Sequence, residues 1–443
     1  MTEREAALDV LLAVLERGEY LANAVDHLLN QAEGSGQRQR FSNESMTGVG
    51  KDKLKQYRQY VKRVTKGVTE RAIELDFRLN RIASQKVKRM HPAVRNILRL
   101  GAYELLYMDS IPAAASVNEC VTLAKRRGQA RAGGMVNAVL RKLAASAQAF
   151  EKTDLSVRYS MPEWITQRWM SRFGGEQTEE MLKAFLQEKP LTVRVNRSRI
   201  SMEAMQEMFT QAGIRTERIG GLPAALVLHR GTVPITRMPG FAEGFFYIQD
   251  PGSMQVCVMA DIRQGESVLD VCAAPGGKAL HAADLAGENG RVEARDVSEQ
   301  KVRRIEENVR RCRFSNISTK VWNAAVFDED STGKYDAVLA DVPCSGLGVL
   351  GRKPEIKYRL TEQDILGLAQ IQRDILECVH SYVKPGGRLV YSTCTISEAE
   401  NEEQAADFLK RHTDFEKIAE KQFIPSTDAP GDGFYVCVMK RNG

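Results

Sequence analysis

The stretch Leu269-Asp270-Val271-Cys272-Ala273-Ala274-Pro275-Gly276-Gly277-Lys278 decides the fold of this chain. It begins inside an apolar run, Ser267 to Val271, with the length of a buried strand, and it continues as a glycine turn and a helix start. Glycines let the backbone approach a ligand closely, and a helix N-terminus offers unpaired N–H groups to an anionic group. The spacing differs from that of the GxGxxG motif and of the P-loop. The stretch therefore predicts a Rossmann-like turn that holds a nucleotide-like cofactor.

Two polar residues follow the next two strand-like runs. Asp296 ends the run Arg291 to Arg295, about twenty residues beyond the turn, where an acidic side chain accepts hydrogen bonds from ribose hydroxyls. Asn323 ends the run Ser318 to Trp322, where a contact to the edge of adenine is expected. The alternative is an ordinary Rossmann-like turn in which Asp296 only caps a helix.

Two cysteines also follow strand-like runs. The run Tyr335 to Ala340 leads into Asp341-Val342-Pro343-Cys344-Ser345-Gly346, and the run Gly387 to Tyr391 leads into Ser392-Thr393-Cys394-Thr395. In an open α/β sheet, ligands bind at the carboxyl ends of the strands. Both thiols are therefore expected beside the glycine turn, whereas a single cysteine elsewhere would more often be a small buried hydrophobe.

A pair of thiols suits methylation of cytosine at C5. This carbon is not nucleophilic until a group adds to C6, and a thiolate is a strong nucleophile for that addition. After methyl transfer the C5 proton must leave and the thiol must be expelled, which a second thiol could assist. Asp341 is the candidate acid beside the base N3. The residues alone leave open which cysteine, Cys344 or Cys394, attacks C6.

Charge and length indicate a multidomain protein that binds a polyanion. The chain has 443 residues and a formal net charge of +6, which favours two or three domains. Basic residues concentrate in the first part, which favours nucleic acid over a merely solvated set of helix faces. A second basic group follows Cys344, suited to phosphates if it is not simply a solvated loop. The basic residues are Lys51, Lys53, Lys55, Arg58, Lys62, Arg63, Lys66, Lys86, Lys88, Arg89, Arg95, Lys125, Arg126, Arg127 and Arg131, then Arg352, Lys353 and Lys357.

The apolar periodicity predicts three parts. Residues 1–148 have helical spacing throughout and predict an all-α domain, with an inter-helix loop from Gln31 to Val49. Residues 154–240 mix helix and strand patterns and predict a small α+β connector. Residues 241–443 alternate short strands with helices and predict an α/β Rossmann-like domain with a mainly parallel sheet.

Cysteine spacing and hydropathy restrict the class further. The eight cysteines form no CxxC pair, so neither a zinc site nor a disulfide framework is predicted, and no metal is expected. Neither a membrane-spanning run nor a signal peptide is evident. We expect a cytoplasmic protein with reduced thiols.

At these residues the chain resembles the RsmB (Sun/Fmu) family of bacterial ribosomal RNA cytosine-C5 methyltransferases. The resemblance runs almost end to end. Ala115 to Val121 and Gly133 to Arg141 are similar to the NusB-like RNA-binding domain of these enzymes. Gln249-Asp250-Pro251-Gly252-Ser253 and Gly431-Asp432-Gly433-Phe434-Tyr435 match further family segments.

The resemblance implies a monomeric enzyme that uses S-adenosylmethionine to methylate C5 of a cytosine in small-subunit (16S) ribosomal RNA, of the cytosine 967 type. It implies that Cys394 is the nucleophile and that Cys344 assists proton removal or product release. Two departures are Asn323 in place of the usual acid, and Ala279 in place of a common Thr or Ser. The implied cofactor contacts are Cys272, Ala273, Ala274, Pro275, Gly276, Gly277, Lys278, Asp296, Asn323 and Asp341, the last facing both cofactor and base.

Two rival functions are weighed against this one. An exocyclic-amine methyltransferase would use an Asp/Asn-Pro-Pro-Tyr loop and no thiol, whereas this chain has Asp341-Val342-Pro343-Cys344. A non-catalytic RNA-binding or ribosome-assembly factor would keep the helical domain and a relict cofactor fold. Asn323 is the feature that favours the relict, and the presence of both cysteines opposes it.

Overall fold

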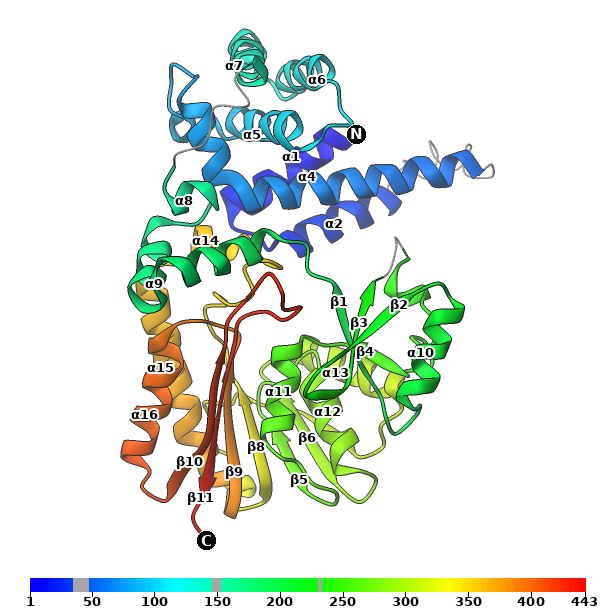
Figure 1. Cartoon of the computed structure of the whole chain (residues 1–443), viewed down its shortest axis with the longest axis vertical. Coiled ribbons are helices and arrows are strands. Elements are labelled where there is room, and N and C mark those ends of the chain that lie inside the picture. Colours follow the sequence, from blue (N-terminus) through cyan, green and yellow to red (C-terminus); the bar gives the residue numbers. More distant parts are fainter. Residues whose placement is uncertain (35–47, 146–152, 230–232) are drawn as a thin grey trace. The chain divides into compact units, whose positions relative to one another are not determined.

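A computed structural model describes residues 1–34, 48–145, 153–229 and 233–443 (Figure 1). The chain forms two compact units. The first, called here the helical unit, comprises Met1–Leu186 together with Leu350–Arg359. The second, the sheet unit, comprises Gln187–Val349 and Leu360–Gly443. The chain therefore leaves the sheet unit just after Cys344, contributes ten residues to the helical unit, and returns.

Helices make up the first unit, as the apolar spacing predicts. The first helix begins with a capping box, in which Thr2 N donates to Glu5 Oε2 (2.7 Å) and Glu5 N donates to Thr2 Oγ1 (3.2 Å), and it ends at Gly18 with φ 72°. The elements are α1 (Glu3–Arg17), α2 (Leu21–Gly34), α4 (Gly48–Asn80), α5 (Pro92–Tyr107), α6 (Ala113–Arg126), α7 (Gly133–Ala145), α8 (Leu155–Arg158), α9 (Glu163–Leu186) and α14 (Ile356–Arg359), with short 3-10 turns at Val87–Arg89 and Ala130–Ala132.

The loop predicted from Gln31 to Val49 is wrong at both ends. Helix α2 continues to Gly34 and α4 starts at Gly48, so the polar composition there did not prevent helix formation. Residues 35–47 of the predicted loop lie outside the described residues.

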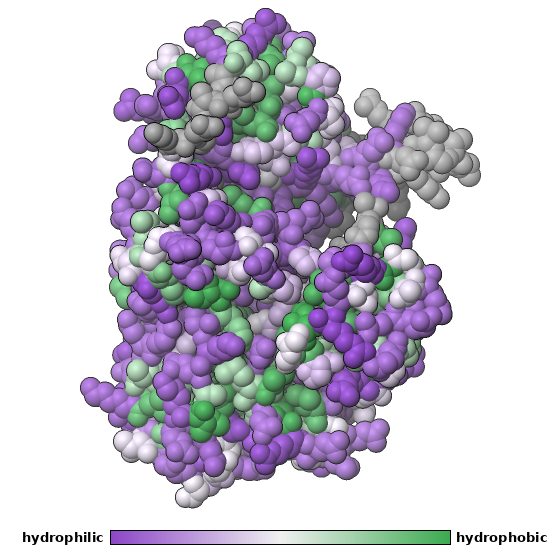
Figure 2. All heavy atoms as spheres, viewed as in Figure 1, coloured by the Kyte–Doolittle hydropathy of each residue, from purple (hydrophilic) through white to green (hydrophobic). Residues whose placement is uncertain are grey.

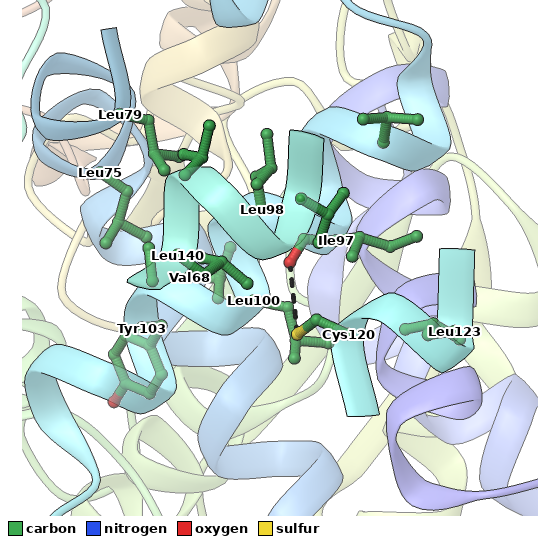
Figure 3. Close-up of a cluster of buried hydrophobic side chains, with 14 of the residues drawn as sticks. Val68, Leu75, Leu79, Ile97, Leu98, Leu100, Tyr103, Cys120, Leu123 and Leu140 are labelled. Atoms are coloured by element: carbon green, nitrogen blue, oxygen red, sulfur yellow. Dashed lines mark hydrogen bonds between the residues drawn. The ribbon is translucent and has the colours of Figure 1, made fainter. Parts of the chain in front are cut away.

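The core of the helical unit collects the apolar faces of its helices (Figure 3). Leu75 and Leu79 of α4, Leu100 of α5 and Leu140 of α7 are fully buried there. Cys120 of α6 is also buried, and its Sγ lies 3.9 Å from the carbonyl oxygen of Ile97. This thiol is part of the core. Nowhere in the described chain does the structure contain a helix with the length and hydropathy of a membrane span.

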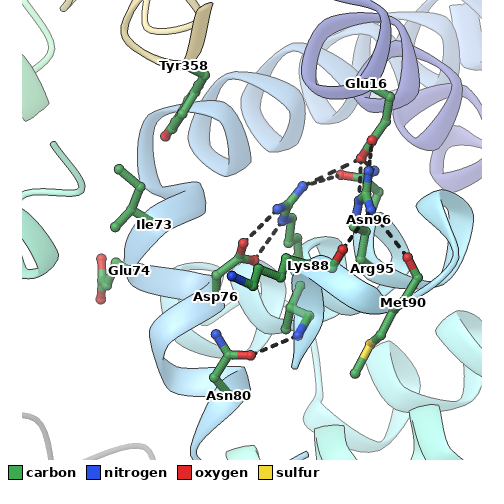
Figure 4. Close-up of polar contacts among 12 residues, drawn as sticks. Glu16, Ile73, Glu74, Asp76, Asn80, Lys88, Met90, Arg95, Asn96 and Tyr358 are labelled. Atoms are coloured by element: carbon green, nitrogen blue, oxygen red, sulfur yellow. Dashed lines mark hydrogen bonds and ion pairs between the residues drawn. The ribbon is translucent and has the colours of Figure 1, made fainter. Parts of the chain in front are cut away.

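Several basic residues of this unit hold helices together rather than forming a free cationic surface. Arg95 donates to Glu16 Oε1 (2.7 Å), which links α5 to α1, and Asn96 donates to the same carboxylate oxygen (2.7 Å) (Figure 4). Arg127 pairs with Asp9 at 2.7 Å. Arg95 and Arg127 are therefore removed from the basic surface that the sequence predicted, because their charges are compensated within the fold.

The sheet unit begins with a small antiparallel sheet in the strand order β2-β3-β1-β4. Its helix α10 begins at a Ser201 cap, with Ala204 N donating to Ser201 Oγ (3.1 Å). The strand β2 was not predicted, because its sequence Arg215–Ile219 is largely polar and exposed on an edge. The elements are β1 (Leu191–Val195), α10 (Met202–Gln211), β2 (Arg215–Ile219), β3 (Leu222–His229), a 3-10 turn at Ile235–Arg237 and β4 (Phe246–Ile248).

The larger sheet has seven strands in the order β10-β11-β9-β8-β5-β6-β7. Strands β5 to β9 are parallel, as predicted, and the two C-terminal strands add an antiparallel edge that the sequence analysis did not anticipate. Its elements are α11 (Pro251–Met259), β5 (Ser267–Asp270), α12 (Gly277–Ala286), β6 (Arg291–Asp296), α13 (Glu299–Cys312), β7 (Ile317–Val321), β8 (Tyr335–Asp341), α15 (Glu362–Val379), β9 (Val383–Thr393), α16 (Glu402–Arg411), β10 (Phe415–Phe423) and β11 (Phe434–Arg441), with 3-10 turns at Glu329–Ser331, His380–Tyr382 and Glu398–Glu400.

Burial in this sheet explains its sequence pattern. The segment Ala337 to Ala340 of β8 is fully buried, as a parallel strand covered on both faces requires. Hydrophobic side chains on the face in Figure 2 form small patches among hydrophilic ones. Most long aliphatic side chains are thus taken up by the cores, and polar residues that remain buried need a specific explanation.

Replacing Gly67 by alanine should destabilise the helical unit. A Cβ at this α4 position would lie 2.0 Å from Tyr103 Cζ, so the aromatic ring (Figure 3) or the helix must shift. We expect a loss of about 1–3 kcal/mol in unfolding free energy, measured by urea denaturation. The matched control is Gly134→Ala in α7, where no atom lies within 4 Å and alanine should be neutral or slightly stabilising. Equal stability of the two variants would contradict the packing described here.

Candidate active site

The predicted glycine turn leaves β5 and enters α12. Val271 N donates to Leu339 O (3.0 Å) and Ala273 N donates to Arg295 O (2.8 Å), so the neighbouring strands β8 and β6 hold the turn on both sides. Gly276 has φ 109°, a conformation that residues with a Cβ rarely adopt, and it is the N-cap of α12. The Ala274–Pro275 peptide is cis. The first N–H groups of α12, which have no partner within the helix, therefore lie directly after the turn, at the carboxyl edge of the sheet.

Asp296 lies beside this turn, at the end of β6. Its Oδ2 accepts from Ala274 N (3.0 Å), its Oδ1 accepts from Val297 N (2.8 Å), and Lys301 pairs with it at 3.0 Å. The side chain is largely buried. The structure thus joins the predicted ribose-binding acid directly to the glycine turn.

Asn323 is exposed in the loop after β7, and its Oδ1 accepts from Ala325 N (3.1 Å). Three large apolar side chains on the loops after β6 and β7 are also exposed: Val297 by 56%, Val326 by 50% and Phe327 by 52%. Exposed apolar groups at a ligand-binding edge suit the face of a nucleobase. The sequence analysis selected Asn323 and missed these three neighbours.

A partly buried pair of charges joins the turn to the end of β8. Lys278 Nζ lies 2.6 Å from Asp341 Oδ2, while Asp341 Oδ1 accepts from Ser392 Oγ (2.9 Å). Burial opposes the charge on Lys278, but the Asp341 carboxylate raises its pKa overall. Asp341 and Lys278, both predicted site residues, are therefore in direct contact.

Asp270, at the end of β5, is a site residue that the sequence analysis did not select. Its carboxylate is fully buried, and neither oxygen has a hydrogen-bond partner within the described part of the chain. Burial raises the pKa of Asp270 to about 7, and the nearby Lys278 opposes this shift. An acidic residue inside an otherwise apolar strand was the available signal.

The two predicted thiols are adjacent. Cys344 Sγ lies 3.2 Å from Cys394 Sγ, both thiols are reduced, and both are partly buried. The hydrogen bond with Cys394, followed by burial, raises the pKa of Cys344 well above its usual value. Either sulfur can donate the hydrogen bond in this contact, and the raised pKa favours the protonated form of Cys344.

A buried polar network fixes the loop that carries Cys344. Glu400 Oε1 accepts from Ser345 N (2.8 Å), and its Oε2 accepts from Ser345 Oγ (2.5 Å). Gln372 of α15 donates to Pro343 O (2.9 Å) and to Glu400 Oε1 (3.1 Å). Ser345 Oγ also lies 2.7 Å from Thr395 Oγ1, beside Cys394. Burial raises the pKa of Glu400.

Backbone contacts bring the two thiol loops together with a third segment. Gly348 N donates to Cys394 O (3.0 Å), and Gly433 N donates to Gly348 O (2.8 Å). A Cβ on Gly348 would lie only 2.1 Å from Gly433 O, so this approach requires glycine. Asp432 N donates to Asp250 Oδ2 (3.2 Å), which joins the segments at 249–253 and 431–435.

One part of the predicted phosphate-binding group is wrong. Lys357 is buried in the helical unit, where its Nζ donates to Glu70 O (2.7 Å), and burial lowers its pKa to about 7. Arg352 and Lys353 are exposed, as predicted. The charge pattern alone did not distinguish these positions, because burial of Lys357 depends on packing against the distant helix α4.

A mainly parallel sheet with a glycine turn, an adjacent acid and exposed apolar side chains at its carboxyl edge is typical of the Rossmann-like class that binds nucleotide-like cofactors, to which S-adenosylmethionine-dependent methyltransferases belong. A family model described as 16S rRNA methyltransferase RsmB/F matches residues 257–440, a NusB family model matches residues 1–145, and a ferredoxin-like domain model of RsmF/B-like methyltransferases matches residues 161–236. The chain belongs to the ribosomal RNA small subunit methyltransferase B family, whose members use S-adenosylmethionine.

Relatives cover the chain almost end to end. A probable ribosomal RNA small subunit methyltransferase B from Synechocystis sp. is 32% identical over 94% of this chain and 90% of that protein. A protein of the same name from Bacillus subtilis is 33% identical over 92% of this chain and 96% of that protein. The solved structure of a methyltransferase homologue from Pyrococcus horikoshii is 26% identical, with a TM-score of 0.58 over 65% of this chain and 98% of that one.

Replacing Asp270 by asparagine should change how stability depends on pH. The raised carboxyl pKa means that the folded state binds more protons than the unfolded state between about pH 4 and 7, so wild-type stability falls as pH rises through that range. Asp270→Asn should raise the thermal midpoint of the cofactor-free protein at pH 8 and change it little at pH 4. Scanning calorimetry at both values checks this, with exposed Asp261→Asn as the control. An equal effect at both pH values would show that Asp270 does not titrate there.

Proposed function

We propose that this protein transfers a methyl group from S-adenosylmethionine to C5 of a cytosine in 16S ribosomal RNA, through a covalent cysteine adduct at C6. The single observation that carries the proposal is the 3.2 Å contact between Cys344 Sγ and Cys394 Sγ, made by two loops at the carboxyl edge of the sheet. Family membership supports the RNA substrate. We propose the cytosine 967 type of target, a monomeric enzyme and domain boundaries at 1–148, 154–240 and 241–443.

The residues around the glycine turn fit the cofactor. Bound S-adenosylmethionine supplies an electrophilic methyl group on a positively charged sulfur. Asp296 is fixed to accept from ribose hydroxyls, and the exposed apolar side chains after β6 and β7 suit the adenine. The buried Asp270 carboxylate has both oxygens unpartnered among the described residues and can receive a positively charged group. We assign the cofactor contacts to Cys272, Ala273, Ala274, Pro275, Gly276, Gly277, Lys278, Asp296, Asn323 and Asp341.

Cys394 is the proposed nucleophile. Its thiolate adds to C6 of the cytosine, forming a carbon–sulfur bond and moving electron density to C5, while N3 takes up a proton from solvent, beside Asp341. The assignment of attack to Cys394 follows the resemblance, and the raised pKa of Cys344, caused by its hydrogen bond with Cys394 and by burial, is consistent with it.

Cys344 is the proposed release residue. Once C5 carries the methyl group, loss of the C5 proton restores the C5–C6 double bond and breaks the carbon–sulfur bond. The Cys344 thiol donates its hydrogen bond to the departing Cys394 sulfur, and the protons from C5 and from N3 pass to solvent. The Ser345, Gln372 and Glu400 contacts position Cys344 for this step.

Two alternatives are less consistent with this site. An exocyclic-amine methyltransferase has no use for two adjacent thiols. A non-catalytic RNA-binding factor has no need of the network that holds Ser345 and Thr395 beside them. Asn323 favours neither, because its side-chain carbonyl is engaged in a local turn with Ala325.

Incubation with unmodified 16S ribosomal RNA and methyl-labelled S-adenosylmethionine should place the label in 5-methylcytidine. The RNA is digested to nucleosides, which are separated and identified by mass spectrometry. Label in N4-methylcytidine would instead support the exocyclic-amine reaction. If calorimetry shows that the protein binds S-adenosylmethionine but naked RNA gains no label, the assay is repeated on small ribosomal subunits. Label in the subunits would show that the enzyme needs the ribosomal particle as substrate, and no label would support a relict cofactor fold without activity.

The two cysteines should behave oppositely when replaced. Cys344→Ala should accumulate a covalent protein–RNA adduct on a denaturing gel, because addition proceeds while release is slowed. Cys394→Ala should abolish both the adduct and methylation. The control is Cys378→Ala, which removes a partly buried thiol of α15 and should behave like wild type. An adduct formed by Cys394→Ala but not by Cys344→Ala would reverse the assignment.

A further inference from the structure

A pocket of about 470 Å³ lies within the helical unit, between the start of α2, the middle of α4 and the segment Leu350–Arg359. Its lining residues belong to the helical unit, whereas the thiols and the glycine turn belong to the sheet unit. Four basic side chains line it: Lys62 and Lys66 of α4, and Arg352 and Lys353 of the inserted segment. The acidic lining residues are Asp26 and Glu355, and Lys66 also pairs with Glu70 at 3.3 Å, so the pocket keeps a small excess of positive charge.

Tyr20 gives this pocket an aromatic wall. The side chain is 48% exposed, and the guanidinium of Arg359 lies over its ring, 5.1 Å from the ring centre. Much of the remaining lining, including Leu21 and Val25, is apolar. An exposed aromatic ring among cations is the combination on which proteins stack the bases of single-stranded RNA while binding its phosphates.

Glu355 supplies an independent observation that points to a ligand. The residue is 2% exposed, and its Oε1 accepts from Leu21 N (3.1 Å), which caps the start of α2. Its Oε2 is buried and has no hydrogen-bond partner within the described residues. A buried carboxylate oxygen without a donor is costly. A base with an amino group or a ring N–H would supply that donor.

We propose that this pocket binds one unpaired nucleotide of the RNA substrate. The base stacks on Tyr20 and donates to Glu355, and the adjoining phosphates contact the four basic side chains. This inference rests on the proposed function, which it deepens by giving the RNA a second, specific contact remote in sequence from the glycine turn.

The pocket also includes part of the segment that follows the Cys344 loop along the chain. The inserted segment is fixed in the helical unit by two partly buried hydrogen bonds, Lys357 Nζ to Glu70 O and Tyr358 OH to Thr69 O, both 2.7 Å. Arg352 and Lys353 lie between these anchors and the Cys344 loop along the chain. RNA that contacts Arg352 and Lys353 therefore contacts the segment that follows the thiol loop along the chain.

The test uses the full-length protein, an unmodified 16S ribosomal RNA fragment and fluorescence titration at several salt concentrations. Arg352→Ala/Lys353→Ala should weaken RNA binding at least ten-fold and make the salt dependence of log K shallower by about 1.4, the value for two single-strand phosphate contacts. The control is Arg263→Ala/Lys334→Ala, which removes the same charge from exposed residues before β5 and β8. Equal effects of the two double variants would overturn the proposal.

Base stacking and base identity are tested separately. Tyr20→Ala should weaken binding about ten-fold and Tyr20→Phe should leave it unchanged, because phenylalanine retains the ring. Glu355→Gln should alter the preference among single-stranded homopolymers, since an amide replaces the carboxylate acceptor. Circular dichroism confirms folding of each variant. If neither tyrosine variant loses affinity, the assignment of Tyr20 as the stacking ring is overturned.

Failure of this proposal is distinguishable from failure of the proposed function. Pocket variants that bind RNA and form 5-methylcytidine like wild type would reject the pocket and leave the reaction in place. Weakened binding in the pocket variants, with wild type forming no 5-methylcytidine, would support the pocket and reject the reaction.

Discussion

Parallel pairing of β8 with β9 sets the positions of both thiols. Asp341 lies opposite Ser392 in this register, and Cys344 and Cys394 follow in the loops just beyond. Because both strands are buried on both faces, the apolar pattern alone discriminates weakly between neighbouring registers. Polar contacts at the strand ends supply the discrimination: Ser392 with Asp341, Ser345 with Thr395, and Gly348 with the carbonyl of Cys394. The reactive geometry and the register are therefore specified by the same contacts.

The charges beside the thiols carry a second constraint. Asp270, Asp296 and Asp341 lie close to the glycine turn, where Lys278 pairs with Asp341 and Lys301 with Asp296. The Asp270 carboxylate remains without a hydrogen-bond partner among the described residues. Its raised pKa reflects the free-energy cost of burying the charged form. A positively charged ligand would offset the cost, so the same feature that burdens the cofactor-free fold favours a cationic cofactor over a neutral one.

The parts of this structure that were predictable from the sequence are those whose signal is local. The turn at 269–278 and the two cysteine motifs are each a continuous stretch of sequence that follows an apolar strand. The topology of the sheet then brings all three to one edge. Glu400 and Gln372 were missed because they act on Ser345 and Pro343 from distant helices and turns. Lys357 was misplaced for the same reason, since its burial against α4 has no local signal.

The inserted segment, Leu350–Arg359, is an integral part of the helical unit. If Met1–Leu186 folded as an appended module, its contribution would be limited to tethering RNA near the enzyme. Instead, Glu355 caps α2, and Lys357 and Tyr358 bond to backbone carbonyls of α4, so the chain after Cys344 completes the helical fold. If a ligand on the helical unit and a ligand at the thiol loop are coupled through this segment, thermodynamic linkage requires that the coupling be equal in both directions.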